Sequence, residues 1–302
     1  MICNVISYQG YIGGNDGDCN TGRGNKKIFS AGTKKFYALD DVSVLIPRQG
    51  LTIFKGRSGS GKTTLLNILG ALDAPSAGEV VFLGEKLSEK TGEELEKLRR
   101  YQMGFVFQSA AMIPYMSAYE NVEFALRLSD YSGDRGKRVR EILGRVGLLK
   151  RMEHMPDELS GGERQRVAVA RALAHHPAVI FADEPTGAVD SRTAGEIMAL
   201  FRHLNETLNL TILIVTHDMA LADSVSRIVM ISDGKVSTEK IKRKTVMAGF
   251  GEEEESHEEF AVMDRANRLQ LKEEFLDAAG INSNKVKVEV ENGKIVISRK
   301  ES

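Results

Sequence analysis

Short apolar runs alternate with longer helical patterns along most of the chain. The apolar runs predict strands at residues 51–54, 80–83, 103–107, 178–182 and 210–215. The longer segments predict helices at residues 64–70, 92–100, 117–150, 163–175 and 191–207. The run at 178–182 has no polar alternation, as expected of a parallel strand that is buried on both faces. Strands that alternate with helices in this way predict an α/β fold with a mostly parallel sheet.

The N-terminal end and a stretch near the C-terminal end break this pattern. Residues 1–27 are rich in Gly, Asn and Asp, and we expect them to form a flexible arm. Residues 241–262 contain the acidic block 252–259, which is typical of a solvated linker. The main domain is therefore predicted to span residues 28–240.

The last segment, residues 263–302, predicts a small module of its own. It contains a short helix that ends at a glycine, residues 273–280, and a hairpin at 285–297 around Asn292 and Gly293. About 40 residues with one hairpin bury too little apolar surface to fold alone. We expect the module to pair with a copy of itself or to dock on the main domain.

A phosphate-binding loop follows the predicted strand at residues 51–54. The stretch 56–64 fits the pattern G-x-x-x-x-G-K-[ST] and lies between a predicted strand and a predicted helix. Its glycines let the backbone N–H groups point inward, and the helix N-terminus adds a partial positive charge. Lys62 supplies a full charge for the β- and γ-phosphates, and the Thr63 hydroxyl can ligate Mg²⁺. The predicted nucleotide-binding residues of the loop are Gly56, Arg57, Ser58, Gly59, Ser60, Gly61, Lys62, Thr63 and Thr64.

Further polar residues follow other strands. Gly56, Gln108, Asp183 and His217 come just past four separate strands. Ligands of parallel sheets bind beyond the carboxyl ends of the strands, so we expect these residues to share one site. A second anion site is predicted at the helix start near Ser160, where Glu163 completes a capping-box pattern.

Composition indicates the cellular compartment and the kinds of partner to expect. The net charge of −1 gives no reason to expect nucleic acid as a partner. Cys3 and Cys19 make no disulfide framework, which favours a reducing compartment. No apolar stretch approaches the ~18 residues of a membrane span, and the start of the chain does not resemble a signal peptide. We expect a cytoplasmic protein without a covalent membrane anchor, linked to a membrane only through a partner.

The motifs together resemble the ATP-binding subunit of ABC transporters over residues 28–240. The resemblance rests on a Walker A loop at 56–63, a signature at 159–163, a Walker B strand at 179–183 and a D-loop at 187–190, with Gln108 as the Q-loop residue and His217 as the switch histidine. It implies a P-loop NTPase fold with an antiparallel β subdomain and a helical subdomain at about 109–170. Residues 71–79 and 186–191 look most like the branch for lipoprotein release, macrolide or peptide efflux and cell division.

The resemblance also implies a role for each residue. ATP and Mg²⁺ are the expected cofactors, with Thr63, Gln108 and Asp183 at the metal. Lys62 holds phosphates, Glu184 is the general base and His217 fixes the attacking water and the γ-phosphate. Two copies dimerise head to tail, and each ATP lies between one Walker A loop and the other copy's signature and D-loop, through Ser160, Gly161, Gly162 and Asp190.

The same resemblance implies a membrane partner. The apolar segment 110–116 would receive the coupling helix of an integral membrane permease, and the protein would lie on the inner face of the cell membrane. Ordinary core packing is the alternative interpretation of this segment. The adenine would stack on Phe29, with Tyr37 and Tyr8 as alternatives. Arg57 departs from the family, which usually has proline there.

The C-terminal module carries a separate resemblance, to one protomer of a swapped-hairpin, AbrB-type domain. Members of that family dimerise and many bind DNA. Basic and acidic residues interleave here, which favours dimerisation or regulation over DNA binding.

Two other functions stay open. One is a soluble ABC ATPase of DNA repair or chromosome work, although residues 64–158 contain neither the heptads nor the cysteines of the usual inserts. The other is an ATPase with a DNA-binding regulatory tail.

Overall fold

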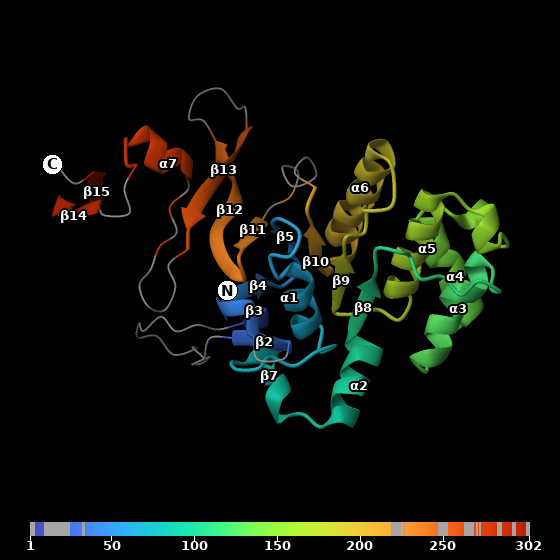
Figure 1. Ribbon diagram of the computed structural model, residues 1–302. Helices are drawn as coiled ribbons and strands as arrows, with labels where there is room; N and C mark the ends of the chain where they lie inside the picture. Colours follow the sequence, from blue (N-terminus) through green and yellow to red (C-terminus); the bar gives the residue numbers. More distant parts are fainter. Residues whose placement is uncertain are drawn as a thin grey trace.

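A computed structural model describes residues 4–8, 25–31, 34–218, 225, 227–246, 253–262, 269, 271, 273–282, 286–291 and 294–299. Its centre is a seven-stranded sheet in the order β13-β12-β11-β5-β10-β9-β8 (Figure 1). Strands β11, β5, β10, β9 and β8 run parallel, while β12 and β13 are antiparallel additions at one edge. The strands are β5 Leu51–Lys55, β8 Met103–Val106, β9 Val179–Asp183, β10 Thr211–Thr216, β11 Arg227–Ser232, β12 Lys235–Val246 and β13 Glu253–Ala261.

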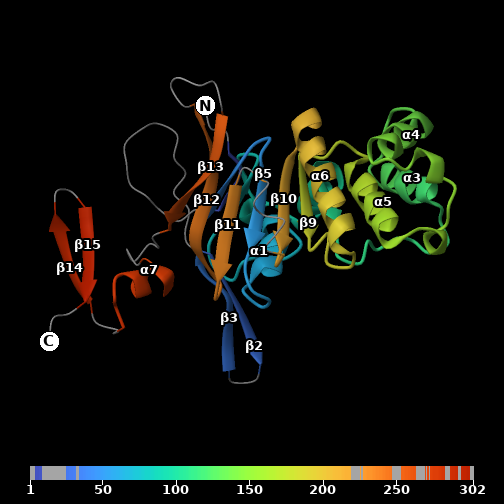
Figure 2. The same cartoon turned by 90° about the horizontal axis from the view of Figure 1, so that it is seen from above.

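The central strands are apolar on both faces because both faces are covered. In β10, Ile212 and Ile214 pack into one hydrophobic cluster, and Leu213 and Val215 pack into another. The first cluster includes helices α3 Ala118–Leu128, α4 Arg135–Arg145, α5 Gly161–Leu173 and α6 Ser191–Leu208. The second includes α1 Lys62–Leu69. Figure 2 shows α6 and α5 on the far side of β10 from α1. The predicted α/β fold with a mostly parallel sheet is confirmed.

An antiparallel sheet covers the α1 face. Its strand order is β4-β1-β6-β7, and a separate pair β2-β3 lies nearby. The bounds are β1 Asn4–Tyr8, β2 Asn25–Ala31, β3 Lys34–Val42, β4 Val44–Pro47, β6 Val80–Phe82 and β7 Glu85–Lys86. This sheet is the antiparallel subdomain that the family resemblance implies.

The predicted flexible arm at 1–27 is wrong for residues 4–8 and 25–27, which lie in strands. Asn4–Tyr8 forms β1, where Ile6 pairs with Ile46 on one side and Phe82 on the other, and β2 begins at Asn25. β1 lies between β4 and β6, and it supplies hydrogen-bond partners for the backbone N–H and C=O groups of both strands. The composition of residues 1–27 cannot reveal that these two distant strands need a partner. Residues 9–24 lie outside the described residues.

Three helices of the segment between residues 91 and 173 begin at a capping box. Capping boxes start α2 Gly92–Gln102 at Thr91, α3 at Ser117 and α5 at Ser160. Short 3₁₀ turns occupy Leu87–Glu89, Leu149–Arg151 and Pro156–Glu158. Arg138 of α4 is buried and donates to Ala174 O (2.9 Å) and Leu173 O (3.2 Å), the last carbonyls of α5. These bonds satisfy a helix end and hold α5 against α4.

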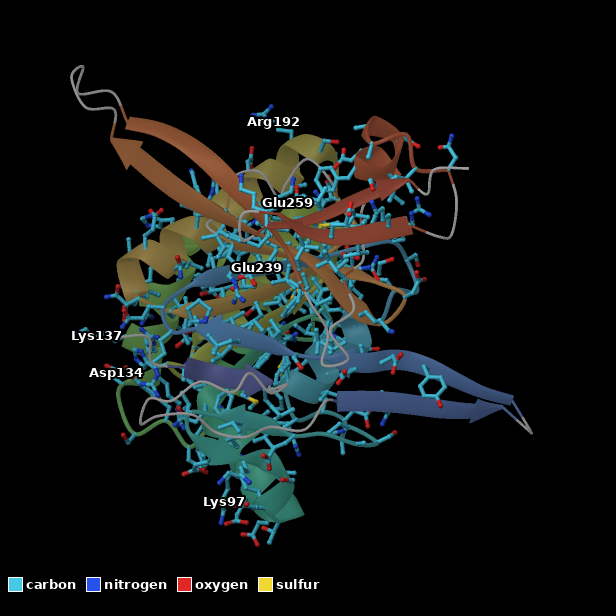
Figure 3. The ribbon with its side chains drawn as sticks, turned by 90° about the vertical axis from the view of Figure 1, so that its left-hand side faces the viewer. Lys97, Asp134, Lys137, Arg192, Glu239 and Glu259 are labelled. Carbon is cyan, nitrogen blue, oxygen red and sulfur yellow. The ribbon has the colours of Figure 1, made fainter. Side chains whose placement is uncertain are left out.

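The predicted acidic linker at 241–262 is also wrong, because most of it is paired. Strands β12 and β13 form an antiparallel hairpin that projects from the molecule (Figure 3). Its register sets Lys240 opposite Glu259 and Lys244 opposite Glu255, and Lys240 Nζ lies 3.9 Å from Glu259 Oε2. Opposite charges across two strands favour pairing, so these two Lys–Glu positions help to pair the acidic block with β12.

The C-terminal module contains the predicted elements. These are α7 Glu273–Ala278 and the hairpin of β14 Val286–Glu291 with β15 Lys294–Arg299. Gly280, at φ 64°, follows α7 as expected of a glycine stop. Val288 and Ile295 are 58% and 65% exposed. Among the described residues, no helix is long and apolar enough to cross a membrane.

Candidate functional site

The loop between β5 and α1 is built on glycine. A Cβ on Gly56 would lie 2.1 Å from Ile231 O, and one on Gly61 would lie 2.3 Å from Ala38 O. Gly61 also caps α1 at φ 99°, a conformation that favours glycine. Arg57, where the family usually has proline, is exposed and leaves the loop's backbone bonds in place, since Ser60 N donates to Arg57 O (3.2 Å). The loop therefore keeps its backbone donors.

Lys62 is buried at the start of α1 and spans the loop. Its Nζ donates to Gly56 O and Arg57 O, both at 2.9 Å. Burial lowers the pKa of Lys62, while the charges of Glu184 and Asp183 oppose that shift. The ammonium is thus held inside the loop, where a phosphate would replace loop carbonyls as its partner.

Thr63 and Asp183 bring together the oxygen ligands that Mg²⁺ prefers. Thr63 Oγ1 donates to Asp183 Oδ1 at 3.0 Å, although 120 residues separate them. Burial raises the pKa of Asp183, and the nearby charge of Glu184 adds to the rise. A hydroxyl and a carboxylate this close fit a magnesium ion that also binds phosphate oxygens. The structure therefore joins two of the three predicted metal ligands.

Glu184 and His217 meet at the ends of neighbouring strands. His217 Nδ1 lies 2.9 Å from Glu184 Oε1, and the His217 backbone N–H donates to the other carboxylate oxygen at 3.3 Å. Glu184 N donates to Val215 O at 2.9 Å. Glu184 has φ 46°, an uncommon conformation for a residue with a side chain. Strand pairing and two contacts from His217 thus hold this carboxylate in a strained position.

Gln108 lies against the D-loop. A Cβ on Gly187 would come within 2.8 Å of Gln108 Nε2, so the amide rests on the backbone of Gly187. Gly187 N in turn donates to Glu184 O at 3.0 Å. The third predicted metal ligand is therefore next to the loop that follows Glu184.

The signature motif occupies the start of α5. Ser160 Oγ accepts from Glu163 N at 3.2 Å, and Glu163 Oε2 accepts from Ser160 N at 2.8 Å. A Cβ on Gly162 would lie 2.4 Å from Thr193 Cγ2, so Gly162 packs closely on α6. In both views α5 and α1 lie on opposite sides of β9 and α6 (Figures 1 and 2). The two predicted anion sites of one chain are therefore apart, as expected if each completes a site in another copy.

Asp190 is the N-cap of α6. Its side chain accepts from Thr193 Oγ1 (2.7 Å) and from the backbone N–H groups of Thr193 (3.0 Å) and Arg192 (3.1 Å). The Thr193 hydroxyl is the largest cause of a lowered pKa of Asp190. The lowered pKa favours the ionised form of this carboxylate, which joins the D-loop to the start of α6.

The adenine-stacking residue stays a prediction. Phe29 is opposite Phe36 in the β2–β3 pair, and its side chain lies outside the described residues. Tyr37 is half exposed and precedes Ala38, whose carbonyl backs Gly61 of the loop. Tyr8 ends β1. Of these three aromatics, Tyr37 is directly followed by a residue that contacts the phosphate loop.

Comparison of the chain with known proteins identifies its family. The family model described as "ABC transporter" matches residues 39–187. An uncharacterised ABC transporter ATP-binding protein of Thermotoga maritima is 44% identical over 224 residues, which cover 74% of this chain and 94% of that one. The chain belongs to the ABC transporter ATP-binding proteins. Members of this family are ATPases, so the chain is an ATP-binding ABC ATPase.

Two named relatives and one solved structure belong to the same family. The lipoprotein-releasing system ATP-binding protein LolD of Syntrophotalea carbinolica is 42% identical over 70% of this chain and 93% of its own length. The macrolide export ATP-binding/permease protein MacB of Burkholderia pseudomallei is 44% identical over 70% of this chain, which covers 33% of MacB. The dimeric cassette MJ0796 of Methanocaldococcus jannaschii, bound to ADP and Pi, superposes with a TM-score of 0.67 at 42% identity, covering 73% of this chain and 97% of that one.

We predict that Mg²⁺·ATP binding weakens as the pH is lowered into the acidic range. Mg²⁺ needs the ionised carboxylate of Asp183, and the raised pKa puts its protonation above the ordinary value of 3.8. Affinity is therefore full above the raised pKa and falls as the pH falls through it. Calorimetric titrations of Mg²⁺·ATP at a series of pH values measure this. Asp183→Asn gives the baseline, because the nucleotide's own protonation is common to both proteins. Parallel pH curves for the two proteins would contradict the prediction.

Proposed function

We propose that this protein is the ATP-hydrolysing motor of an export-type ABC transporter, of the lipoprotein- or peptide-extruding kind. It acts on an integral membrane permease from the cytoplasmic face. The observation that carries the chemistry is the meeting of Lys62, the Thr63–Asp183 pair and the Glu184–His217 pair at one edge of the sheet. The relatives LolD and MacB support the transport branch.

The proposed hydrolysis assigns a step to each of these groups. Thr63 and Asp183, with Gln108 as the third ligand, would hold Mg²⁺, which would neutralise phosphate charge. Lys62 and the loop N–H groups hold the β- and γ-phosphates, where charge builds up in the transition state. Glu184 orients the attacking water and accepts its proton. His217 holds the Glu184 carboxylate through two contacts and presents its exposed ring to the γ-phosphate.

Each complete site needs two chains. The loop of one copy supplies the phosphate cradle, residues 56–64, and the other copy supplies Ser160, Gly161, Gly162 and Asp190. The separation of α1 from α5 within one chain supports this arrangement, as does the dimeric, ADP- and Pi-bound form of MJ0796. ATP is then the ligand that joins the two copies, and its hydrolysis releases them.

Glu184→Gln should lower turnover at least about a hundredfold, because an amide cannot accept the proton of water. The same variant should accumulate as an ATP-bound dimer, because amide and carboxylate have the same shape. Steady-state ATPase assays and size-exclusion chromatography with ATP measure both effects. Glu196→Gln is the matched control, since Glu196 pairs only with arginines on the outside of α5 and α6. Normal hydrolysis by Glu184→Gln would refute the assignment of the base.

The segment after Gln108 is proposed as the permease-docking surface. Tyr115 at its tip is 89% exposed, while Met112 packs on the hydrophobic core. Fully buried Asn121 shapes this tip, because its side chain accepts from Ile113 N (2.8 Å) and donates to Met116 O (2.8 Å). The segment is thus part core and part surface. A rigid, exposed aromatic is a typical anchor for a partner helix.

Tyr115→Asp should reduce co-purification of the permease from membranes about tenfold, because a charge replaces the exposed aromatic that would anchor the partner helix. ATPase activity of the isolated protein should stay within about twofold, since Tyr115 is 89% exposed and is not among the residues assigned to ATP or Mg²⁺. The measurement is mass spectrometry of membrane proteins that co-purify with the tagged chain. Leu128→Asp, at the exposed end of α3, is the control. Equal recovery with both variants would argue against this surface.

The C-terminal module is proposed as an AbrB-like dimerisation and regulatory unit. The exposed apolar residues of its hairpin support pairing with a second copy. A cavity of about 690 Å³ supports regulation, because Leu271 and Leu276 line it together with loop residues Gly56 to Ser60. Lys287 and Glu289 pair within the hairpin at 2.8 Å, which does not favour a DNA-binding surface.

Leu276→Asp should raise basal ATPase activity about threefold or more, because it loosens the module from the rim of the phosphate loop. Phe275→Asp, on the more exposed face of α7, should leave activity near that of the wild type. ATPase assays on the full chain give both values. Equal activities for the two variants would count against regulation, and salt-dependent binding of DNA by the chain would favour a DNA-binding tail instead.

A further inference from the structure

The backbone that presents Gln108 is strained. Ala110 and Ala111 have φ values of 57° and 44°, so two consecutive residues with side chains occupy the left-handed region. Such a conformation is unfavourable for an L residue and persists only where surrounding contacts hold it. Local bonds are few: Ala110 N donates to Phe107 O at 3.1 Å, and Ala111 N to Ser109 O at 2.6 Å. The contacts that hold this segment must therefore come from elsewhere in the fold.

Helix α5 supplies those contacts. Arg171 donates from its two terminal nitrogens to Ala110 O at 2.9 Å and Ala111 O at 2.5 Å. One turn and a half earlier on α5, the buried Gln165 donates to Phe107 O at 3.2 Å. One guanidinium thus spans the carbonyls of both strained residues, and an amide holds the residue before Gln108. These bonds bracket Gln108 on both sides.

Ala110 also packs in the hydrophobic core, while the side-chain hydrogen bonds to the strained pair come from Arg171. Asn121 of α3 organises the segment only from Ile113 onward, and the Gln108 amide rests on the backbone of Gly187. The strained pair itself is therefore bonded to α5, the helix that begins with the signature at Ser160. A helix is rigid over this length, so a displacement of the Gln108 segment is transmitted to the signature.

We propose that Arg171 is a positioning residue for Gln108, tying the Q-loop to the signature helix so that both motifs move as one body. The inference rests on the proposed roles of Gln108 and Ser160 in hydrolysis. Pressure of a permease on the exposed tip at Tyr115 would then reach the two motifs together. An arginine suits this role because its planar fork presents two donors at fixed spacing, which a lysine ammonium does not.

Arg171→Ala should lower kcat about tenfold while KM for ATP stays within about twofold, because the phosphate loop is intact and only Gln108 is misplaced. Arg171→Lys should fall in between, since it keeps one of two bonds. Arg166→Ala is the matched control on α5, since Arg166 bonds Val146 O and Glu196 rather than the Q-loop. It should keep kcat near that of the wild type.

Hydrogen exchange gives a readout that does not need turnover. The amides of residues 107–111 should exchange about tenfold faster in Arg171→Ala than in the wild type or in Arg166→Ala. If Arg171→Ala does not fold, the same comparison with Arg171→Lys decides. Unchanged kcat and exchange in the Arg171 variants would overturn the proposal, and so would equal losses of kcat and thermal midpoint in Arg171→Ala and Arg166→Ala. Absence of ATPase activity in the wild type would instead defeat the proposed function, while the exchange comparison would still test the tie.

Discussion

Parallel pairing of β5, β10 and β9 is the constraint on which the site depends. Its register sets Thr216 beside Lys55 and Val215 beside Asp183, so three strands end at one level. Residues just past those ends then meet without any local sequence relation among them. A shift of one residue in this register would turn each following side chain away, since successive side chains in a strand point to opposite faces. Successive residues of β10 pack against different partners, Ile212 and Ile214 in one hydrophobic cluster and Leu213 and Val215 in the other.

The buried charged side chains of the site would be stabilised by ligands of opposite charge. Burial lowers the pKa of Lys62 and raises that of Asp183, so each group is driven toward its neutral state. Phosphate beside the first and Mg²⁺ beside the second would restore the charged forms. Phosphate and Mg²⁺ would thus offset the cost of burying the charged forms of Lys62 and Asp183. Strain at Glu184 belongs to the same pattern, because strained backbone is frequent where a side chain must face a reaction.

A second group of contacts gathers the helical part around α5. Arg138 holds the end of this helix, Arg171 and Gln165 join it to the Q-loop, and Gly162 lets it pack on α6. The helix is therefore a rigid link between a surface that could meet a permease and a motif that would meet the second ATP. The added C-terminal module approaches the phosphate loop from the other side, through Leu276. About a quarter of this chain lies outside the part aligned with the Thermotoga maritima relative. Regulation particular to this protein would act there.

The sequence by itself determined the phosphate loop, the alternation of the central strands with helices and the residues at the strand ends. Those features are local, because they depend on glycine geometry, helix capping and apolar spacing within a few residues. Only the tertiary structure decided that Asn4–Tyr8 is a strand, that the acidic block pairs with β12, and that Arg171 bonds the segment after Gln108. Each of these depends on a backbone or charge partner far along the chain. A composition rich in Gly, Asn or Glu reports what a segment prefers in water, and it carries no record of the partner that the fold brings beside it.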